Sequence, residues 1–146
     1  MNAAPALDWD DSYLVGHAMM DDTHREFAEL VNTMLVADDA DFASALDAFA
    51  HHAEEHFGSE ERLMDKYAFP PRECHADEHA NVLASVREVQ ALVAAGDVDT
   101  GRGLAQALAD WFPGHSAQMD SALAIWVMKK VAGGAPVVLR RAMRQT

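Results

Sequence analysis

Apolar residues recur every three or four positions along most of this chain, and that spacing predicts helices with one buried face. The expected helices cover roughly residues 20–34, 42–67, 75–93 and 104–126. Short breaks separate them, and the last break is expected to be a turn that includes Gly96 and the 97–103 stretch. Four long amphipathic helices with short connections predict an all-α fold, an up-down-up-down four-helix bundle.

The two ends of the chain lie outside this pattern. Residues 6–15 are expected to form an ordered N-terminal arm. A Gly-Gly-Ala-Pro sequence predicts a linker near the other end, and residues 137–144 are expected to form a short fifth helix. We therefore expect one domain over residues 1–132 and a basic C-terminal tail over 133–146.

The formal net charge of -13 argues against nucleic acid as a partner, because phosphate binding requires clustered Lys and Arg. No Asp or Glu follows Asp120, whereas Lys and Arg do. The tail either partly neutralises the acidic body or docks on an acidic partner. No apolar stretch reaches the ~20 residues of a membrane span, and the start of the chain does not resemble a signal peptide. We expect a cytoplasmic protein, with a monomer favoured.

The positions of the eight histidines indicate the chemistry. Five of them fall on the apolar stripes instead of the polar faces, so that each expected helix carries at least one: His24, His56, His75, His79 and His115. Glu60 follows His56 by one helical turn and shares its face. Asp120 follows His115 by five residues and therefore points partly round the helix.

A buried carboxylate is costly unless it pairs with a cation or binds a metal ion, and no Lys or Arg lies on the inner stripes near Glu60 and Asp120. The sequence therefore predicts a metal site. The single cysteine, Cys74, excludes an internal disulfide and a multi-cysteine metal site. It lies beside His75 and is either a thiol ligand or, more simply, a small helix residue.

The number of ligands predicts two metal ions with one open position. Two bridging carboxylates, five imidazoles and a shared oxide or hydroxide fill all but one position of two octahedral ions. Imidazole and carboxylate suit iron, although zinc, copper and manganese remain alternatives by ligand type. Carboxylate-rich di-iron sites use Glu-x-x-His pairs, which this chain lacks. A histidine-rich, dry site favours reversible uptake of a small diatomic molecule.

With these residues the sequence resembles the hemerythrin family, in particular its single-domain bacterial members. The resemblance runs from Trp9 to about Trp126. Its motifs are Trp9 with Tyr13-Leu14-Val15-Gly16, Met20-Asp21-Asp22-Thr23-His24, His56-Phe57-x-x-Glu60-Glu61, Pro70 with His75-x3-His79, and Trp111-x3-His115-x4-Asp120.

The resemblance implies how these residues divide. His75, His79 and His115 would hold one iron ion and His24 and His56 the other, with Glu60 and Asp120 as bridges. Molecular oxygen would bind at the two-histidine iron. The pocket wall would consist of apolar groups that keep water out: Phe27, Phe57, Met64, Trp111 and Phe112.

The sequence also departs from the family pattern. Ser116 and Gln118 stand where more apolar residues are usual, and they either face outward or admit water. Pro113 before Gly114 predicts a kink that could re-aim His115. Of the other histidines, His52 is expected either to pack half-buried or to partner a ligand, while His17 and His51 are expected at the surface.

These features together predict a non-enzymatic oxygen carrier, store or delivery protein. The alternatives are an oxygen or redox sensor, and a di-iron oxidase or peroxidase acting on peroxide or nitric oxide. A bundle merely stabilised by zinc or by a buried histidine cluster is the structural alternative.

Overall fold

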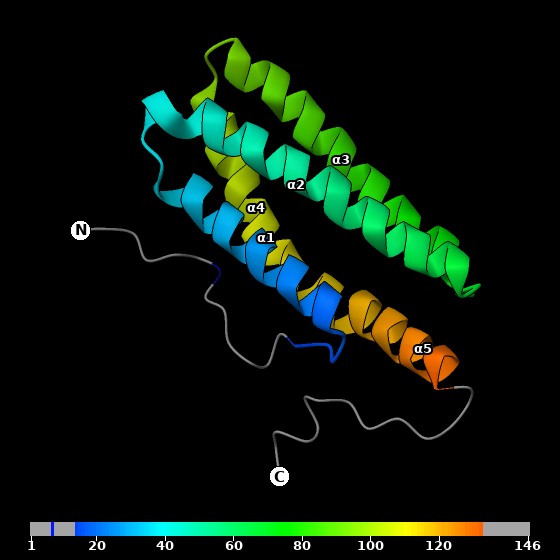
Figure 1. Ribbon diagram of the computed structural model, residues 1–146. Coiled ribbons are helices and arrows are strands. Elements are labelled where there is room, and N and C mark those ends of the chain that lie inside the picture. The colour runs from blue at the N-terminus through cyan, green and yellow to red at the C-terminus, as the bar shows by residue number, and fades with distance from the viewer. Residues whose placement is uncertain (1–6, 8–13, 133–146) are drawn as a thin grey trace.

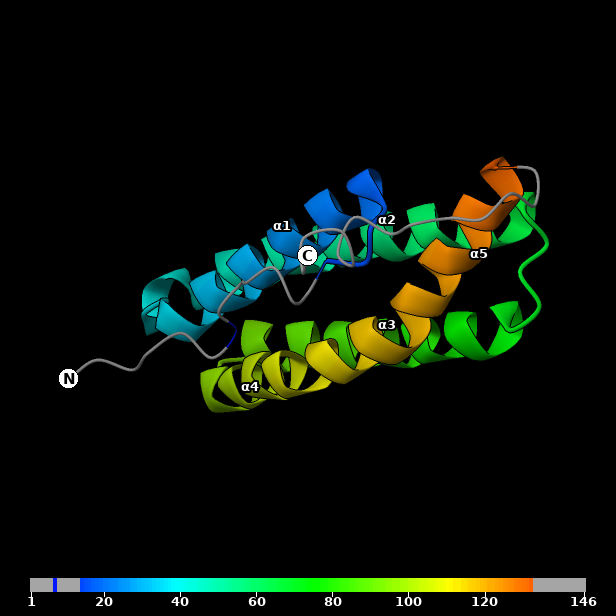
Figure 2. The same ribbon diagram turned by 90° about the horizontal axis from the view of Figure 1, so that it is seen from below.

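The computed structural model describes Leu7 and residues 14–132, and every regular element in that part of the chain is helical. In chain order the elements are α1 (Ala18–Val36), α2 (Asp39–Lys66), α3 (Arg72–Ala94), α4 (Val98–His115), the π-helix η2 (Ser116–Asp120) and α5 (Ser121–Val131). The last three follow one another without a break and form a single bent rod (Figures 1 and 2). The predicted four-helix bundle is therefore confirmed.

Each rod packs against its two neighbours in the bundle, and α2 and α4 also contact each other across it. Helix α1 lies against α2 and α4, and α3 lies against the same two helices on the other side. The four rods thus enclose one long interior, which Figure 2 shows between the α1–α2 layer and the α3–α4 layer. No helix in the described part of the chain is long and apolar enough to cross a membrane.

The turn between α3 and α4 is shorter than the sequence predicts. The prediction of a turn through residue 103 is wrong, because α4 begins at Val98. Gly96 makes the reversal with a φ of 106°, and the Asp97 carboxylate then accepts a hydrogen bond from the Thr100 N–H at 3.1 Å. Such N-cap bonds start helices efficiently. The cap outweighs the two glycines that suggested a turn.

Gly101 has a packing role inside α4. A Cβ atom at this position would lie 2.4 Å from Cε2 of Phe42 and 2.7 Å from Cγ2 of Val93. Only a residue without a side chain allows α4 to approach α2 and α3 this closely. Gly101, which the sequence suggested as a turn residue, therefore lies inside a helix and permits close packing between helices.

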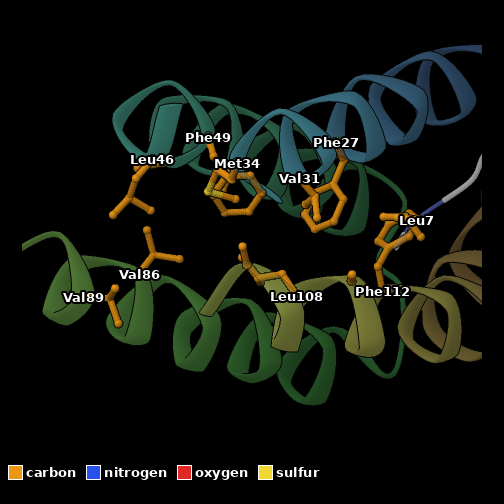
Figure 3. Close-up of a cluster of buried hydrophobic side chains, with 14 of the residues drawn as sticks. Leu7, Phe27, Val31, Met34, Leu46, Phe49, Val86, Val89, Leu108 and Phe112 are labelled. Atoms are coloured by element: carbon orange, nitrogen blue, oxygen red, sulfur yellow. The ribbon is translucent and has the colours of Figure 1, made fainter. Parts of the chain in front are cut away.

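Two apolar clusters fill the interior. The larger includes the residues of Figure 3: Leu7, Phe27, Val31, Met34, Leu46, Phe49, Val86, Val89, Leu108 and Phe112. The smaller lies toward α5 and consists of Val15, Met20, Met64, Phe69, Leu123, Ala124 and Val127. Between these clusters lies a layer of buried polar side chains.

Part of the predicted N-terminal arm is described, and it is attached to α1. Leu7 exchanges two hydrogen bonds with the Asn32 side chain, at 2.7 and 3.2 Å. The buried Asp21 carboxylate accepts hydrogen bonds from the N–H groups of Val15 and Gly16, at 2.7 and 3.3 Å. The rest of the arm, and the predicted linker, fifth helix and tail of residues 133–146, lie outside the described residues.

Candidate metal centre

All seven predicted ligands meet in the polar layer between the two apolar clusters. None is more than 5 % exposed, and they come from all four rods: His24, His56, Glu60, His75, His79, His115 and Asp120. Helical spacing places the histidines on the inner face of each rod. On α1, for example, His24 lies between Met20 of the smaller cluster and Phe27 of the larger one, at the three- and four-residue spacing of one helix face.

Glu60 turns one carboxylate oxygen toward each end of the layer. Its Oε2 lies 2.8 Å from Nε2 of His56 and 3.2 Å from Nε2 of His24. Its Oε1 lies 3.2 Å from Nε2 of His79 and 3.4 Å from Nε2 of His75. One carboxylate therefore faces two separate groups of imidazoles.

Asp120 is divided in the same way. Its Oδ1 lies 3.0 Å from Nε2 of His75 and 3.1 Å from Nε2 of His115, while its Oδ2 lies 3.1 Å from Nε2 of His24. The π-helix makes this contact feasible, because its wider turn brings residues five apart onto one face. The expectation that Asp120 points partly round the helix is corrected by this local conformation.

The donor atoms form two overlapping groups, each within 4.8 Å, that could hold a metal ion. One contains Glu60, His75, His79, His115 and Asp120, and the other contains His24, His56 and Glu60. We call them the three-histidine group and the two-histidine group.

The unpaired atoms of the layer fit metal ions. The Nε2 atoms of His75, His79 and His115 and both Asp120 oxygens are buried, and apart from the imidazole–carboxylate contacts given above they have no hydrogen-bond partner among the described residues. Unpaired buried polar atoms cost free energy, by about 1–3 kcal/mol each. Here they face one another around common centres, where a bound cation would satisfy several of them together.

The carboxylates give the layer a strong attraction for cations. Burial by itself lowers the pKa of a histidine, but the carboxylates of Asp120 and Glu60 outweigh it and raise the pKa of His24 to about 10 and of His75 to about 9. The pKa of Glu60 falls well below its usual range: burial acts to raise it, but the imidazoles of His56 and His24 prevail. Protons occupy the imidazoles readily in a site where metal ions would compete for the same lone pairs.

Two further carboxylates contact the ligands from behind, and the sequence interpretation missed both. Oε2 of Glu61 lies 3.1 Å from Nδ1 of His79. Oε1 of Glu78 lies 2.8 Å from Nδ1 of His115 and accepts a hydrogen bond from the indole N–H of Trp111 at 2.9 Å. In the sequence, Glu61 is part of the motif that contains Glu60, but no role is indicated for it, and Glu78 is marked only by adjacency to His79.

Four of the five residues predicted for the pocket wall belong to the larger cluster or pack against it. Phe27 and Phe112 stack with ring centres 4.6 Å apart, and Phe112 lies 5.2 Å from the His24 ring, edge to face. Phe57 stacks on His79 at 4.0 Å, and the partly buried Trp111 stacks on His115 at 4.4 Å. The fifth residue, Met64, lies in the smaller cluster.

The departures from the family pattern have different outcomes. His115 still reaches the site despite the proline two residues before it. Ser116 is buried at 2 % exposure. Gln118 is exposed and lines a cavity of about 130 Å³ together with Cys74 and His75, so that an outer cavity reaches one candidate ligand.

The remaining histidines lie away from the donor groups. His17 is partly buried and caps α1, since its Nδ1 accepts a hydrogen bond from the Met20 N–H at 3.4 Å; the surface prediction for His17 is wrong. His51 is exposed as predicted. His52 is half-buried against the His56 ring at 5.4 Å, and burial, with the charge of His56, lowers its pKa to about 4. Within the described part of the chain, His52 makes no hydrogen bond to a candidate ligand, which favours the packing role.

Comparison with known proteins agrees with this geometry. Residues 15–126 match the model of the hemerythrin HHE cation binding domain. A bacteriohemerythrin of Ralstonia nicotianae is 41 % identical over 126 residues, which cover 86 % of this chain and 92 % of that protein. Bacteriohemerythrins of Stenotrophomonas maltophilia and Methylococcus capsulatus are 28 % and 25 % identical, over 81 % and 68 % of this chain and 79 % of each relative. The chain belongs to the hemerythrin family, and its relatives there are bacteriohemerythrins.

Proposed function

We propose that this protein holds two iron ions and binds molecular oxygen reversibly between its helices, as a carrier, store or delivery protein and not as an enzyme. The observation that carries the proposal is the division of the two carboxylates. Glu60 and Asp120 each turn one oxygen toward the three-histidine group and the other toward the two-histidine group. This is the arrangement that two bridged metal ions require.

In this proposal His75, His79 and His115 hold one iron ion, and His24 and His56 hold the other. Glu60 and Asp120 bridge the pair, together with an oxide or hydroxide. Imidazole and carboxylate donors suit iron, and the family membership supports the same choice. The bound iron would supply the electrons that oxygen takes up when it binds.

The open position belongs to the two-histidine group, which offers one imidazole fewer than its neighbour. The aromatic side chains around it are apolar: Phe112 lies against His24, and Phe27 lies 5.8 Å from the His56 ring, edge to face. A hydrophobic shell controls the access of solvent to a metal site. Excluding water would slow oxidation of the iron and let oxygen leave unchanged.

The test is the visible absorption of ferrous-loaded protein before air, after air, and after oxygen is removed again. A charge-transfer band that appears with oxygen and disappears on its removal is expected. His56→Gln should abolish the reversible band, while His51→Gln, an exposed change on the same helix, should leave it intact. Direct passage to a stable ferric form would overturn the carrier proposal in favour of redox sensing or peroxide chemistry. Zinc as the bound metal in protein from iron-supplied cells would overturn the iron assignment.

A further inference from the structure

The two donor groups differ in what lies behind their imidazoles. Each of the five histidines directs Nε2 toward the carboxylates of the layer, and Nδ1 points away from it. With a metal ion bound at Nε2, the remaining ring proton would be on Nδ1. A hydrogen bond from this N–H to a carboxylate fixes the ring and makes Nε2 a stronger donor to a metal ion. The partners of the Nδ1 atoms therefore bear on the strength of each metal position.

The His115 side chain is contacted by both a carboxylate and an aromatic ring. Oε1 of Glu78, on α3, lies 2.8 Å from its Nδ1 and accepts the Trp111 indole N–H at 2.9 Å. The Trp111 ring in turn stacks on the His115 imidazole, 4.4 Å between centres and 27° between planes. One carboxylate thus fixes both a ligand and the ring that lies flat against it.

His79 is held in a comparable way. Oε2 of Glu61, on α2, lies 3.1 Å from its Nδ1. The Phe57 ring lies parallel to the His79 imidazole at 4.0 Å, with 5° between the planes. Two ligands of the three-histidine group therefore each have a carboxylate behind them and an aromatic ring against one face.

Among the residues that the structure describes, no carboxylate lies behind either imidazole of the two-histidine group. The Nδ1 atoms of His24 and His56 are buried and, like Nδ1 of His75 in the other group, have no hydrogen-bond partner among the described residues. Their neighbours are rings: Phe112 at 5.2 Å from His24, and Phe27 at 5.8 Å from His56. Among the described residues, the carboxylates behind the ligands, those of Glu61 and Glu78, therefore lie on the side of the three-histidine group.

We propose that Glu78 and Glu61 are positioning residues for one metal position only, and that the three-histidine position therefore binds a divalent metal more tightly and fills first. The inference rests on the paired metal centre of the proposed function, but it does not require oxygen binding. Removal of a carboxylate behind a metal-bound histidine typically weakens metal binding about 10–100-fold. The affinity for metal should therefore be higher at the three-histidine position than at the two-histidine position.

Titration of the metal-free protein with Co²⁺ alone tests the proposal by calorimetry. We expect two binding steps. Glu78→Gln and Glu61→Gln should each weaken the tighter step by about tenfold or more and leave the weaker step unchanged. Glu88→Gln makes the same chemical change at an exposed position of α3 and should alter neither step. Equal weakening of both steps by Glu78→Gln, or no weakening of either, would overturn the proposal.

Proton NMR of the Co²⁺-loaded variants supplies a readout that a purely structural effect would not move. The imidazole N–H signals of the ligands are shifted far from the other resonances by the paramagnetic ion. Glu78→Gln should move one of them and Glu61→Gln a different one, because each carboxylate faces a single Nδ1. Displacement of every ligand signal by either variant would show a general distortion and contradict the assignment.

The same variants separate this inference from the proposed function. Two unequal Co²⁺ steps without a reversible oxygen band would overturn oxygen carriage and leave the inference standing. Two equal Co²⁺ steps in a protein that binds oxygen reversibly would overturn this inference and leave the proposed oxygen carriage standing. Trp111→Phe removes one donor to Glu78 but keeps the ring and the Glu78–His115 contact, so it should weaken the tighter step less than Glu78→Gln.

Discussion

His115 and Asp120 are five positions apart on one rod, yet Nε2 of His115 lies 3.1 Å from Oδ1 of Asp120. In a regular α-helix five residues turn the chain about 500°, so the two side chains would point about 140° apart. The chain between them forms the π-helix η2, whose wider turn removes this difference. The π-helix thus sets the position of the Asp120 carboxylate, which would bridge the two metal ions of the proposed function.

A one-residue deletion and a one-residue insertion in η2 should therefore have opposite outcomes. Deletion of Gln118 leaves a four-residue spacing, which places His115 and the aspartate on one face of an ordinary α-helix. The register of α5 is then preserved, so metal binding should survive. An alanine inserted after Ala117 rotates Asp120 and α5 by about 100°.

Metal content after Co²⁺ loading, with thermal unfolding as a check on the fold, distinguishes these variants. The insertion is expected to lose metal and stability together. Equal loss of metal from the deletion would contradict the role assigned to the π-helix.

Metal-free protein should lose stability as the pH rises from neutral to alkaline. The pKa values of His24 and His75 are raised to about 10 and about 9 in the folded chain. A group whose folded pKa is raised stabilises the fold fully below its unfolded pKa of about 6.5, and that contribution disappears as the pH passes the folded pKa. The Tm of the metal-free protein should therefore decrease as the pH is raised from about 7 to about 10.

Bound metal reverses this trend, because metal and proton compete for the same imidazoles. The difference in Tm between Co²⁺-loaded and metal-free protein should accordingly grow over the same pH range. A metal-free Tm that stays constant or rises from pH 7 to pH 9 would count against the pairing of these histidines with Glu60 and Asp120.

Two glycines of α4 should respond oppositely to alanine. Gly101→Ala places a methyl group 2.4 Å from a Phe42 ring carbon, and overpacking of this kind costs about 1–3 kcal/mol. Gly103→Ala meets nothing within 4 Å and should gain about 0.5–1 kcal/mol from better helix propensity. Urea unfolding of the two variants measures both changes, and a stabilised Gly101→Ala protein would refute the close approach of the helices.

Replacement of Phe112 should affect the site and not merely the core. Phe112→Leu opens space beside His24, 5.2 Å away, and in the proposed di-iron protein water entering there should speed oxidation of the ferrous form several-fold. Phe42→Leu removes similar volume from the same cluster, next to Gly101. The rate at which the oxygenated band is lost in air compares them. Similar rates in both variants, at similar loss of stability, would mean that Phe112 does not shield the iron.

The helices and the seven candidate ligands could be predicted because both follow from periodicity and residue type. Histidines and acidic residues on apolar stripes are unusual enough to mark a site without any structure. The start of α4 could not be predicted in the same way. Its glycines suggested a turn, while the decisive features were the cap between Asp97 and Thr100 and the contact of Gly101 with Phe42.

The carboxylates behind the ligands were not predictable for a different reason. Glu61 and Glu78 are about one-third exposed, and glutamates on outer helix faces are ordinary. Which of them turns back toward a histidine depends on the packing of neighbouring helices. The five-residue spacing of His115 and Asp120 could be read from the sequence, but the π-helix that brings the two side chains together could not be predicted from it.

The polar layer also divides the interior, because on α1, α2 and the rod of α4 to α5 it separates the smaller apolar cluster from the larger one. Without metal, the layer between the two clusters consists of seven polar side chains, so we expect the end that contains Leu123 and Val127 to open more readily than the other end. Bound metal ties all four rods across this boundary. Amide hydrogen exchange at the α5 end should then slow to the rate of the rest, and metal content would decide whether the bundle unfolds as one cooperative unit or as two.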